Sequence, residues 1–415
     1  MRARIHRGAH EVGGNCIELE ARAQRIVLDI GHPITTAPGE DVPLPGVAGF
    51  DGSDDSLVGI VISHPHPDHF GLLPKVSESV PRYIGEAAAD VLREAAFFSP
   101  FGLDVKPAGF LRHRQTIEIG PFRITPFLND HSAFDAYSLL IDAEGRRLFY
   151  TGDIRAHGRK AGIFEELLRK PPENLDVLLM EGTHIRAESN CTERGASEKD
   201  VEDACVETFK STEGMVLAMF SPQNIDRLVS MYRACVRSGR DLVVDLYAAA
   251  IAKATGRATI PQADWDRVRV YLPKSQKAKI IQAQAFERTD AVKPHRIYPE
   301  ELVERRSELV TLFRGSMARE LQQIGCLGGA RVVWSMWHGY LRNDPGSKLT
   351  EFLEREEIPM VSHHASGHAY VPDLQRLVAA LAPKRVVPIH SFAGDRFAEF
   401  FPRVDRRTDG EWWEV

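Results

Sequence analysis

The sequence predicts an α/β protein in which a sandwich of two sheets is interrupted by a second α/β domain. Residues 1–185 hold many short strands and few helices, which favours sheets packed face to face with helices outside. From residue 186 helices and strands alternate, as is typical of a parallel α/β layer. Residue types that bind metals occur on both sides of 186–345. We therefore expect one domain formed by 1–185 and 346–415, and an inserted domain at 186–345.

In the first domain, strands are predicted at short runs of β-branched and aromatic residues, most of them bounded by Gly, Pro, Asp or Asn. These runs lie at 4–6, 16–20, 25–29, 57–63, 124–127, 137–141, 148–151 and 177–180. Helical patterns interrupt the strands at 85–98 and 162–169. After the insertion we expect a helix at 347–356 and strands at 359–362 and 385–388.

In the inserted domain, longer amphipathic patterns predict helices at 197–212, 225–238 and 299–324. Apolar runs between them predict strands at 216–220, 241–245 and 331–335.

The composition excludes several classes of protein. The chain has 415 residues with 52 Lys and Arg against 58 Asp and Glu, a net charge of −6, so nucleic acid can be bound only through a local basic patch. The five cysteines are scattered and form no CxxC pair, which argues against a disulfide framework and indicates a reducing cytoplasm. No secretory h-region or membrane-length apolar run is found, so we expect a cytoplasmic protein without a membrane partner; a homodimer is compatible with the sequence.

A basic patch lies at 265–300, which contains eight Lys and Arg and four Asp and Glu, an excess of four positive charges. The patch includes Lys274, Lys277 and Lys279, which lie close together in the sequence. Aromatic residues interleaved with these charges either stack on bases or belong to the core. Trp337, further along the chain, is expected in the core or at a hinge between domains.

The densest chemical signal follows the apolar strand 57–62. Four side chains that can bind metals fall within six residues, namely His64, His66, Asp68 and His69. Pro65 and Pro67 exclude a helix and favour extended backbone, in which residues two apart point the same way. His64 and His66 can therefore converge on one ion, while Asp68 and His69 turn toward a second. Imidazole and carboxylate without thiolate suit Zn²⁺, with Mn²⁺ or Fe as alternatives.

Two further candidates come later in the chain. His131 follows the strand at 124–127, and Asp153 ends the run Leu148-Phe-Tyr-Thr-Gly-Asp153, where Gly152 permits close backbone approach. A carboxylate at the end of a strand can bridge two ions.

In this order, His64-x-His66-x-Asp68-His69, His131 and Asp153 resemble the metal motifs of the metallo-β-lactamase superfamily. The resemblance implies an αββα sandwich with the metals at the sheet edge. Asp29 is similar to an early strand-end aspartate of that fold, which has a structural role.

Other segments resemble the β-CASP nucleases of that superfamily, and in particular the ribonuclease J group. Residues 180–184 resemble motif A, 221–224 the opening of the inserted β-CASP domain, 364–368 motif B, and 388–390 motif C. Two departures are the serine at 391, where the group usually has Gly, and the end of the chain at Val415 without a further C-terminal domain. We therefore expect a short relative of ribonuclease J.

The resemblance implies a role for each matching residue. Two Zn²⁺ ions (or Mn²⁺) are held by His64, His66, His131, Asp68, His69, His390 and the bridging Asp153. Asp68 is also counted with the catalytic residues. His368 is the general acid, oriented by Glu181, and a hydroxide between the ions attacks the phosphorus.

The resemblance also implies that phosphates of the substrate are held by His364, Ser366, Gly367, Ser221 and Asn224. The expected function is zinc-dependent hydrolysis of phosphodiester bonds, in single-stranded RNA rather than DNA because motif C carries His390. The alternatives are a DNA nuclease, a lactonase or thioesterase of the same superfamily, and an inactive subunit that binds nucleic acid.

Overall fold

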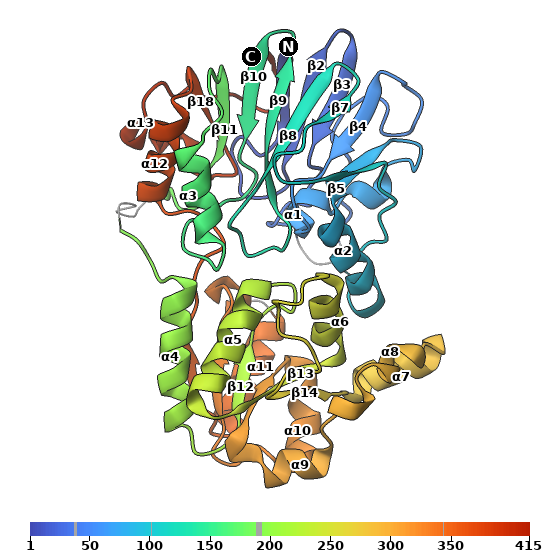
Figure 1. The fold of residues 1–415 in the computed structure, drawn as a ribbon, viewed down its shortest axis with the longest axis vertical. Coiled ribbons are helices and arrows are strands. Elements are labelled where there is room, and N and C mark those ends of the chain that lie inside the picture. The colour runs from blue at the N-terminus through green and yellow to red at the C-terminus, as the bar shows by residue number, and fades with distance from the viewer. Residues whose placement is uncertain (37–39, 101, 188–192, 343) are drawn as a thin grey trace. The chain divides into compact units, whose positions relative to one another are not determined.

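The protein folds as two compact units, seen in the computed structural model of Figure 1. The structure describes residues 1–36, 40–100, 102–187, 193–342 and 344–415. The first unit comprises Met1–Gly195 and Gly367–Val415, and the second comprises Ala196–Ser366. The second unit therefore begins and ends later in the chain than the inserted domain that we drew at 186–345.

The later end has a physical cause. Helix α11 (Asp344–Arg355) places Leu349, Phe352 and Leu353 in the core of the second unit. Strand β17 (Met360–Ser362) pairs in parallel with a strand of the second unit's sheet. The segment that we assigned to the returning first domain thus still belongs to the second unit.

The first unit contains two mixed sheets. The first sheet has the strand order β19-β1-β2-β3-β4-β5-β6. Its strands are β1 (Arg2–Arg7), β2 (Cys16–Ala21), β3 (Gln24–Leu28), β4 (Leu57–Val61), β5 (Arg82–Gly85), β6 (Gly109–Leu111) and β19 (Trp412–Glu414). The strands from β3 to β6 run parallel, whereas β19, β1, β2 and β3 pair antiparallel.

The second sheet has the order β18-β11-β10-β9-β8-β7. Its strands are β7 (Ile117–Ile119), β8 (Phe122–Leu128), β9 (Tyr137–Ala143), β10 (Arg146–Tyr150), β11 (Val177–Glu181) and β18 (Arg385–Ile389). Strands β10, β11 and β18 are parallel, and β8 shares their direction because β8 and β10 are both antiparallel to β9. The carboxyl ends of these four strands therefore meet at one edge.

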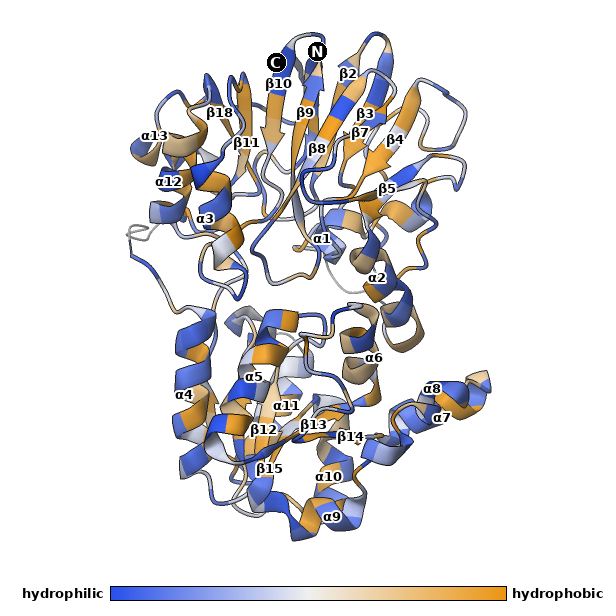
Figure 2. Cartoon of the chain, in the orientation of Figure 1, coloured by the Kyte–Doolittle hydropathy of each residue, from blue (hydrophilic) through white to orange (hydrophobic). Residues whose placement is uncertain are grey.

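Alternation along the strands divides the side chains between two faces. In β9, Leu139 and Ile141 join the core between the sheets, while Leu140 joins the core under the outer helices. Both faces of β9 and β11 are buried, so these strands are apolar along most of their length (Figure 2).

Helices cover both outer faces of the sandwich. The first sheet is covered by α1 (Pro67–Phe70) and α2 (Glu86–Phe98); the second is covered by α3 (Ala161–Arg169), α12 (Val371–Leu381) and α13 (Phe397–Phe400). The expected αββα order of layers is confirmed.

The second unit is built on one parallel sheet of order β14-β13-β15-β12-β16-β17. Its strands are β12 (Val216–Met219), β13 (Asp241–Asp245), β14 (Val268–Tyr271), β15 (Leu309–Leu312), β16 (Arg331–Trp334) and β17. Its helices are α4 (Glu198–Ser211), α5 (Ile225–Ser238), α6 (Leu246–Ala254), α7 (Lys274–Ala283), α8 (Glu287–Asp290), α9 (Pro299–Glu304), α10 (Ala318–Ile324) and α11. The predicted parallel α/β layer is confirmed.

Short 3-10 helices complete the described structure. They are η1 (Leu73–Lys75), η2 (Lys293–His295), η3 (Arg306–Glu308), η4 (Gly315–Met317), η5 (His338–Arg342) and η6 (Gly394–Arg396). Within the described ranges, no helix is both long and apolar enough to cross a membrane.

One predicted helix was wrong in part. The pattern at 299–324 holds α9 and α10 at its ends, but the strand β15 lies between them. The four residues Leu309–Leu312 are all buried, and β15 is hydrogen-bonded between β13 and β12 in the middle of the sheet. Periodicity alone does not separate so short an apolar run from a turn of helix.

Candidate metal centre

The cluster of histidines after β4 lies in a loop that turns into a helix. His66 is extended, with φ −95° and ψ 142°, as predicted. The expectation that Pro67 excludes a helix was wrong, because Pro67 opens α1. A proline is tolerated in the first helical turn, where its missing N–H has no intrahelical partner. Asp68 and His69 therefore project from a helical turn.

Gly31 packs directly against the backbone of this turn. A Cβ on Gly31 would lie 1.7 Å from the carbonyl oxygen of Asp68, so the two backbones meet at a distance that only glycine permits. The backbone around Gly31 is also hydrogen-bonded to the turn, because Ile30 N donates to His69 O and His32 N donates to Pro67 O.

The first group of candidate ligands consists of His64, His66, His131 and Asp153, whose donor atoms lie within 4.8 Å of one another. Nε2 of His131 is 3.1 Å from Nδ1 of His66. Oδ2 of Asp153 is 3.6 Å from Nε2 of His64 and 3.8 Å from Nε2 of His131. Nitrogen atoms from three rings and one carboxylate oxygen thus face a common point.

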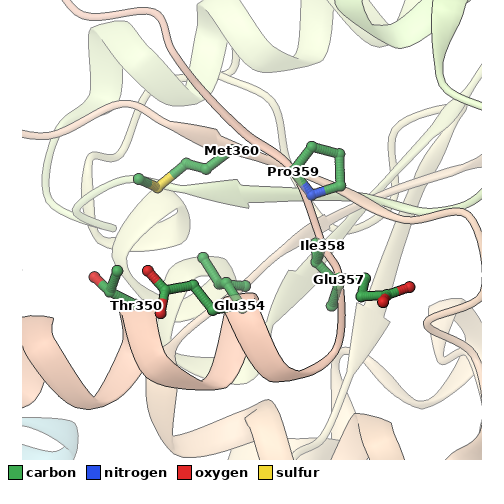
Figure 3. A pocket seen from close by; sticks show the side chains of 7 residues that line it. Thr350, Glu354, Glu357, Ile358, Pro359 and Met360 are labelled. Atoms are coloured by element: carbon green, nitrogen blue, oxygen red, sulfur yellow. The ribbon is translucent and has the colours of Figure 1, made fainter.

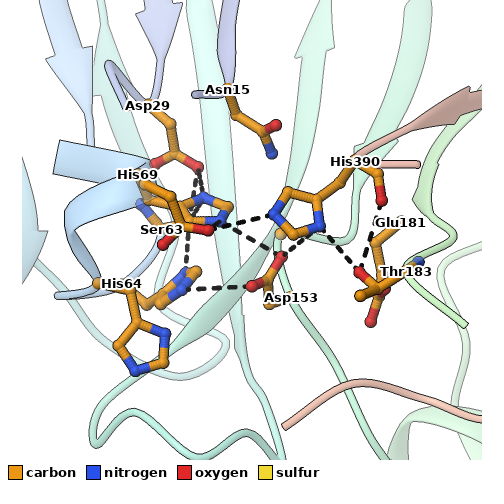
Figure 4. A network of polar contacts seen from close by, with 12 residues as sticks. Asn15, Asp29, Ser63, His64, His69, Asp153, Glu181, Thr183 and His390 are labelled. Carbon is orange, nitrogen blue, oxygen red and sulfur yellow. Dashed lines mark hydrogen bonds and ion pairs between the residues drawn. The ribbon is translucent and has the colours of Figure 1, made fainter. Parts of the chain in front are cut away.

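The second group consists of Asp68, His69, His390 and again Asp153. Nε2 of His390 is 3.3 Å from Oδ2 of Asp68, and Nε2 of His69 is 3.3 Å from Oδ1 of Asp153. The two oxygens of Asp153 therefore face different groups, as Figure 4 shows for His64 and His69.

Hydrogen bonds behind the rings fix which nitrogen points inward. Nδ1 of His69 donates to Oδ2 of Asp29 over 2.7 Å, and Nδ1 of His131 donates to the carbonyl of Gly367 over 2.6 Å. Ser63 Oγ donates to Asp29 and so accepts from Nδ1 of His64, at 3.0 Å. In the rings of His64 and His131, Nε2 is left with its lone pair toward the centre, as metal-binding histidines require, and Nε2 of His69 also points inward.

Three buried polar atoms of these groups have no hydrogen-bond partner among the described residues. They are Nε2 of His64, Nε2 of His69 and Oδ1 of Asp153. Such atoms are costly unless something satisfies them. Neutral imidazole and carboxylate donors gathered in this way fit divalent cations.

The charge states of the histidines are also compatible with metal binding. Burial lowers the pKa of His64, His66 and His131, so these rings are neutral at pH 7, the form that binds metal. Burial alone would also lower the pKa of His69, but nearby carboxylates, Asp153 first, outweigh it and hold that pKa well above its ordinary value. At His69 a cation would replace a proton.

Beside the centre lies a carboxylate–histidine pair. Nδ1 of His368 is 3.4 Å from Oε1 of Glu181 and 3.7 Å from Oδ2 of Asp153. Glu181 is fully buried and accepts hydrogen bonds from the backbone amides of Thr183, at 3.1 Å, and Ala369, at 3.3 Å. Burial disfavours a charged imidazole, but Glu181 and then Asp153 outweigh it and raise the pKa of His368 to about 9.

Thr183 was missed as a site residue by the sequence reasoning. Its Oγ1 lies 3.1 Å from Nδ1 of His368 and 2.9 Å from Nδ1 of His390, so one hydroxyl serves both rings. The signal was present, because Thr183 lies within the quoted motif of residues 180–184.

The predicted phosphate-binding residues are divided between the units. Gly367 belongs to the first unit, where its carbonyl holds His131. His364, Ser366, Ser221 and Asn224 belong to the second unit. Asn224 caps α5 by accepting from Arg227 N at 3.0 Å, and Ser221 Oγ accepts from Gln223 N at 3.3 Å.

His364 has an unusual setting within the second unit. Its Nδ1 is buried without a hydrogen-bond partner among the described residues. Burial, reinforced by Arg227, lowers the pKa of His364 to about 4, so the ring is neutral at pH 7. A neutral ring offers hydrogen bonds to a phosphate but no charge.

A separate hollow of about 330 Å³ lies between α11 and β17 in the second unit (Figure 3). Leu353, Ile358 and Met360 give it apolar walls, and Glu354 and Glu357 add negative charge. That charge opposes phosphate, and no candidate metal ligand lines the hollow.

Comparison with known proteins gives these groups a context. A family model described as a β-lactamase superfamily domain matches residues 45–215. A protein named ribonuclease J from Mycobacterium tuberculosis is 23% identical over 92% of this chain and 67% of its own length. A protein of the same name from Sinorhizobium meliloti is 22% identical over 94% of this chain and 69% of its own length. Another from Corynebacterium glutamicum is 25% identical over 92% of this chain and 52% of its own length.

The fold itself is shared with a solved structure. A crystal structure of a protein of unknown function from Enterococcus faecalis V583 matches with a TM-score of 0.78 and 21% identity, over 99% of both chains. The chain therefore carries a β-lactamase superfamily domain and is a homologue of ribonuclease J over most of its length.

Proposed function

We propose that this protein is a zinc-dependent nuclease that hydrolyses phosphodiester bonds in RNA, with single strands preferred. The observation that carries the proposal is the position of Asp153, with one carboxylate oxygen toward each group of candidate ligands and the Glu181–His368 pair beside it. The relatives named ribonuclease J support RNA as the substrate, since two of them match over 92% of this chain or more.

Two cations fit the proposal better than one. His64, His66 and His131 would hold the first, Asp68, His69 and His390 the second, and Asp153 both. Zn²⁺ suits these nitrogen and oxygen donors, and Mn²⁺ is the alternative. Bound there, such ions supply Lewis acidity and positive charge toward the phosphoryl oxygens.

His368 is proposed to give a proton to the leaving oxygen. Glu181 raises the pKa of His368, which favours the protonated ring that a general acid needs before it acts. Glu181 orients the ring and stabilises its charge, and its own backbone hydrogen bonds hold it in place. Asp68 contributes by fixing His390 and by binding metal rather than by proton transfer.

The second unit is proposed to be a β-CASP domain that binds the substrate. Ser221, Asn224, His364 and Ser366, with the amide of Gly367, are the proposed phosphate contacts. A cytoplasmic location is part of this proposal and agrees with the four described cysteines, 16, 205, 235 and 326, which are all free and buried.

The test uses end-labelled single-stranded RNA and DNA of one sequence, incubated with the full-length protein and Zn²⁺ or Mn²⁺. Cleavage of RNA at a rate above that of DNA supports the proposal. A chromogenic phosphodiester and an acyl ester are assayed in parallel, and turnover of the acyl ester alone would identify a lactonase or thioesterase instead.

The variant Asp153→Asn tests the bridging role, because it keeps the shape of the side chain but weakens a bridging ligand. It should lose at least one ion and nearly all turnover. Full metal content and normal rates in this variant would contradict the bridging role.

A further inference from the structure

The second unit exposes an aromatic pair at the carboxyl edge of its sheet. Trp337 is 58% exposed and Tyr340 is 53% exposed, although we had expected Trp337 in the core or at a hinge. Their rings meet edge to face, with centroids 5.5 Å apart and an interplanar angle of 85°. Single exposed apolar residues are ordinary, but two large aromatic rings in contact at a surface point to a ligand.

The indole of Trp337 packs against the backbone of its own loop. Its ring lies against the backbone of Gly339, where a Cβ would come within 2.2 Å of two ring atoms. Glycine therefore makes the room in which the ring of Trp337 rests. A ring that already rests against the backbone loses less conformational entropy when a flat ligand stacks on its open face.

The pair stands between two segments that we propose as phosphate contacts. Tyr340 belongs to η5 and Trp337 directly precedes it, so both follow β16, while Ser221 and Asn224 follow β12 and His364 follows β17. These strands are neighbours in the order β12-β16-β17 and run parallel, so the three segments share one edge. Ligands of parallel α/β sheets bind at this edge.

Arg227 ties the three segments together. It lies in the first turn of α5, three residues after Asn224. Nη1 donates to the carbonyl of Ser335 over 2.6 Å, and Nη2 donates to the carbonyl of Ala365 over 3.2 Å. On the far side, Nε2 of His338 is 2.8 Å from Oγ of Ser362. These bonds join the segment that carries the aromatic pair to the segments that carry the candidate phosphate contacts of the same unit.

We propose that Trp337 and Tyr340 form a stacking site for a base of single-stranded nucleic acid. The inference rests on the proposed function and names the part of the substrate that this edge would recognise. Every base has a flat π face, so the site would increase affinity without selecting a sequence. Its contribution depends on bases, whereas that of the phosphate contacts depends on charge.

The experiment separates these two contributions. Binding of a fluorescent phosphorothioate oligouridylate, whose linkages slow hydrolysis, is compared with binding of the same oligomer carrying abasic residues. The wild-type protein should bind the base-containing oligomer at least about fivefold more tightly. Trp337→Ala should remove most of that difference, with the affinity for the abasic oligomer and its salt dependence unchanged. Trp337→Phe should retain part of it.

A second variant moves the ring without deleting it. Gly339→Ala should displace the indole and reduce the difference between the two oligomers in the same way. The control is Trp412→Ala, because Trp412 is a partly exposed indole on β19 of the first unit, with Arg2 and Arg4 over its ring. Trp412→Ala should leave the difference intact.

The outcomes distinguish the two proposals. If Trp337→Ala and Gly339→Ala keep the wild-type preference for bases, the stacking site is refuted while the nuclease proposal stands. If the wild-type protein binds neither oligomer, the nuclease proposal fails and the stacking site fails with it.

Discussion

Oδ2 of Asp29 lies 2.7 Å from Nδ1 of His69 at the back of the candidate metal centre. Asp29 is fully buried, and its carboxylate also accepts from the backbone and hydroxyl of Ser63 and from the hydroxyl of Tyr150. Four donors therefore converge on one carboxylate, which fixes the ring of His69 and, through Ser63, that of His64.

Asp29→Asn should weaken metal binding without unfolding the protein. The amide group of Asn would face at least one of the donors that Asp29 accepts, so the ring of His69 would lose its fixed orientation. Loss of such a partner behind a ligand typically lowers metal affinity about 10- to 100-fold. Competition with a zinc chelator measures the effect, and an unchanged affinity would show that Asp29 has no influence on the centre. The exposed Asp51 provides the control variant Asp51→Asn.

Gly31→Ala should disrupt the turn that presents Asp68 and His69. The added Cβ would collide with the carbonyl oxygen of Asp68, which is backbone and cannot rotate away. We expect lower metal content and a Tm reduced by several degrees, since strain of a few kcal/mol shifts Tm on that scale. Gly46→Ala is the matched control, because no atom lies within 4 Å of its added Cβ. Equal Tm values for the two variants would refute the close-approach argument.

The local chemistry of the centre was predictable because it is encoded in contiguous residues. Their spacing after a strand was enough to predict His64, His66, Asp68 and His69 as ligands. In the structure all four belong to the two groups that share Asp153. His390 required the analogy, since a lone histidine after a strand carries no signal of its own. It reaches the centre because β18 pairs with β11, which is a property of the sheet and not of the local sequence.

The sequence analysis missed two elements, helix α12 and strand β15, for different reasons. Helix α12 was overlooked although its signals were present: apolar residues at 371, 374, 377, 378 and 381, and a proline in its first turn. Strand β15 could not be separated from its helical surroundings, because its burial depends on the neighbouring strands β12 and β13. Tertiary packing decides such short runs.

Neutralising Lys274, Lys277 and Lys279 together should weaken RNA binding to a similar degree for all sequences. The three residues are exposed on α7, which contains no acidic residue (Figure 1). Each phosphate contact contributes about 0.7 to the slope of affinity against salt for single strands, so the slope should fall by about two. Neutralising Lys199 and Lys210, both exposed on α4, is the control. An unchanged slope in the triple variant would mean that α7 is only a solvated helix.

Glu18→Gln should reduce stability in a pH-dependent way. Burial alone would raise the pKa of Glu18, but hydrogen bonds from His6, at 2.8 Å, and Arg25, at 2.6 Å, outweigh it and lower that pKa. A lowered pKa in the folded state means that ionised Glu18 stabilises the protein above its unfolded pKa of about 4.3. This stability is lost as the pH falls through the folded pKa.

The difference in unfolding free energy between wild type and Glu18→Gln should therefore be on the order of 3 kcal/mol at pH 7, the usual loss when a buried ion pair is broken. It should shrink steadily below about pH 4.3. Urea unfolding across this range measures it. Glu118→Gln, at a position that is 77% exposed, should show no such trend. A constant difference at every pH would assign the loss to packing and not to charge.

His368 and His390 should respond differently to the same substitution. Both rings lie beside Thr183 Oγ1, and they stack with centroids 5.4 Å apart, but only His390 contacts Asp68. His368→Ala should keep both metals and keep substrate affinity within a few-fold, while turnover falls by roughly 10²–10⁴, the usual contribution of positioned proton transfer. The loss should be smaller with a nitrophenyl phosphodiester, whose leaving group hardly needs a proton.

His390→Ala should lose metal first and activity as a consequence. Glu181→Gln should lie between wild type and His368→Ala, because it keeps the shape but removes the charge that holds the imidazolium. Metal content measured beside the rate decides the assignment: if His368→Ala loses an ion and His390→Ala does not, the two roles are exchanged.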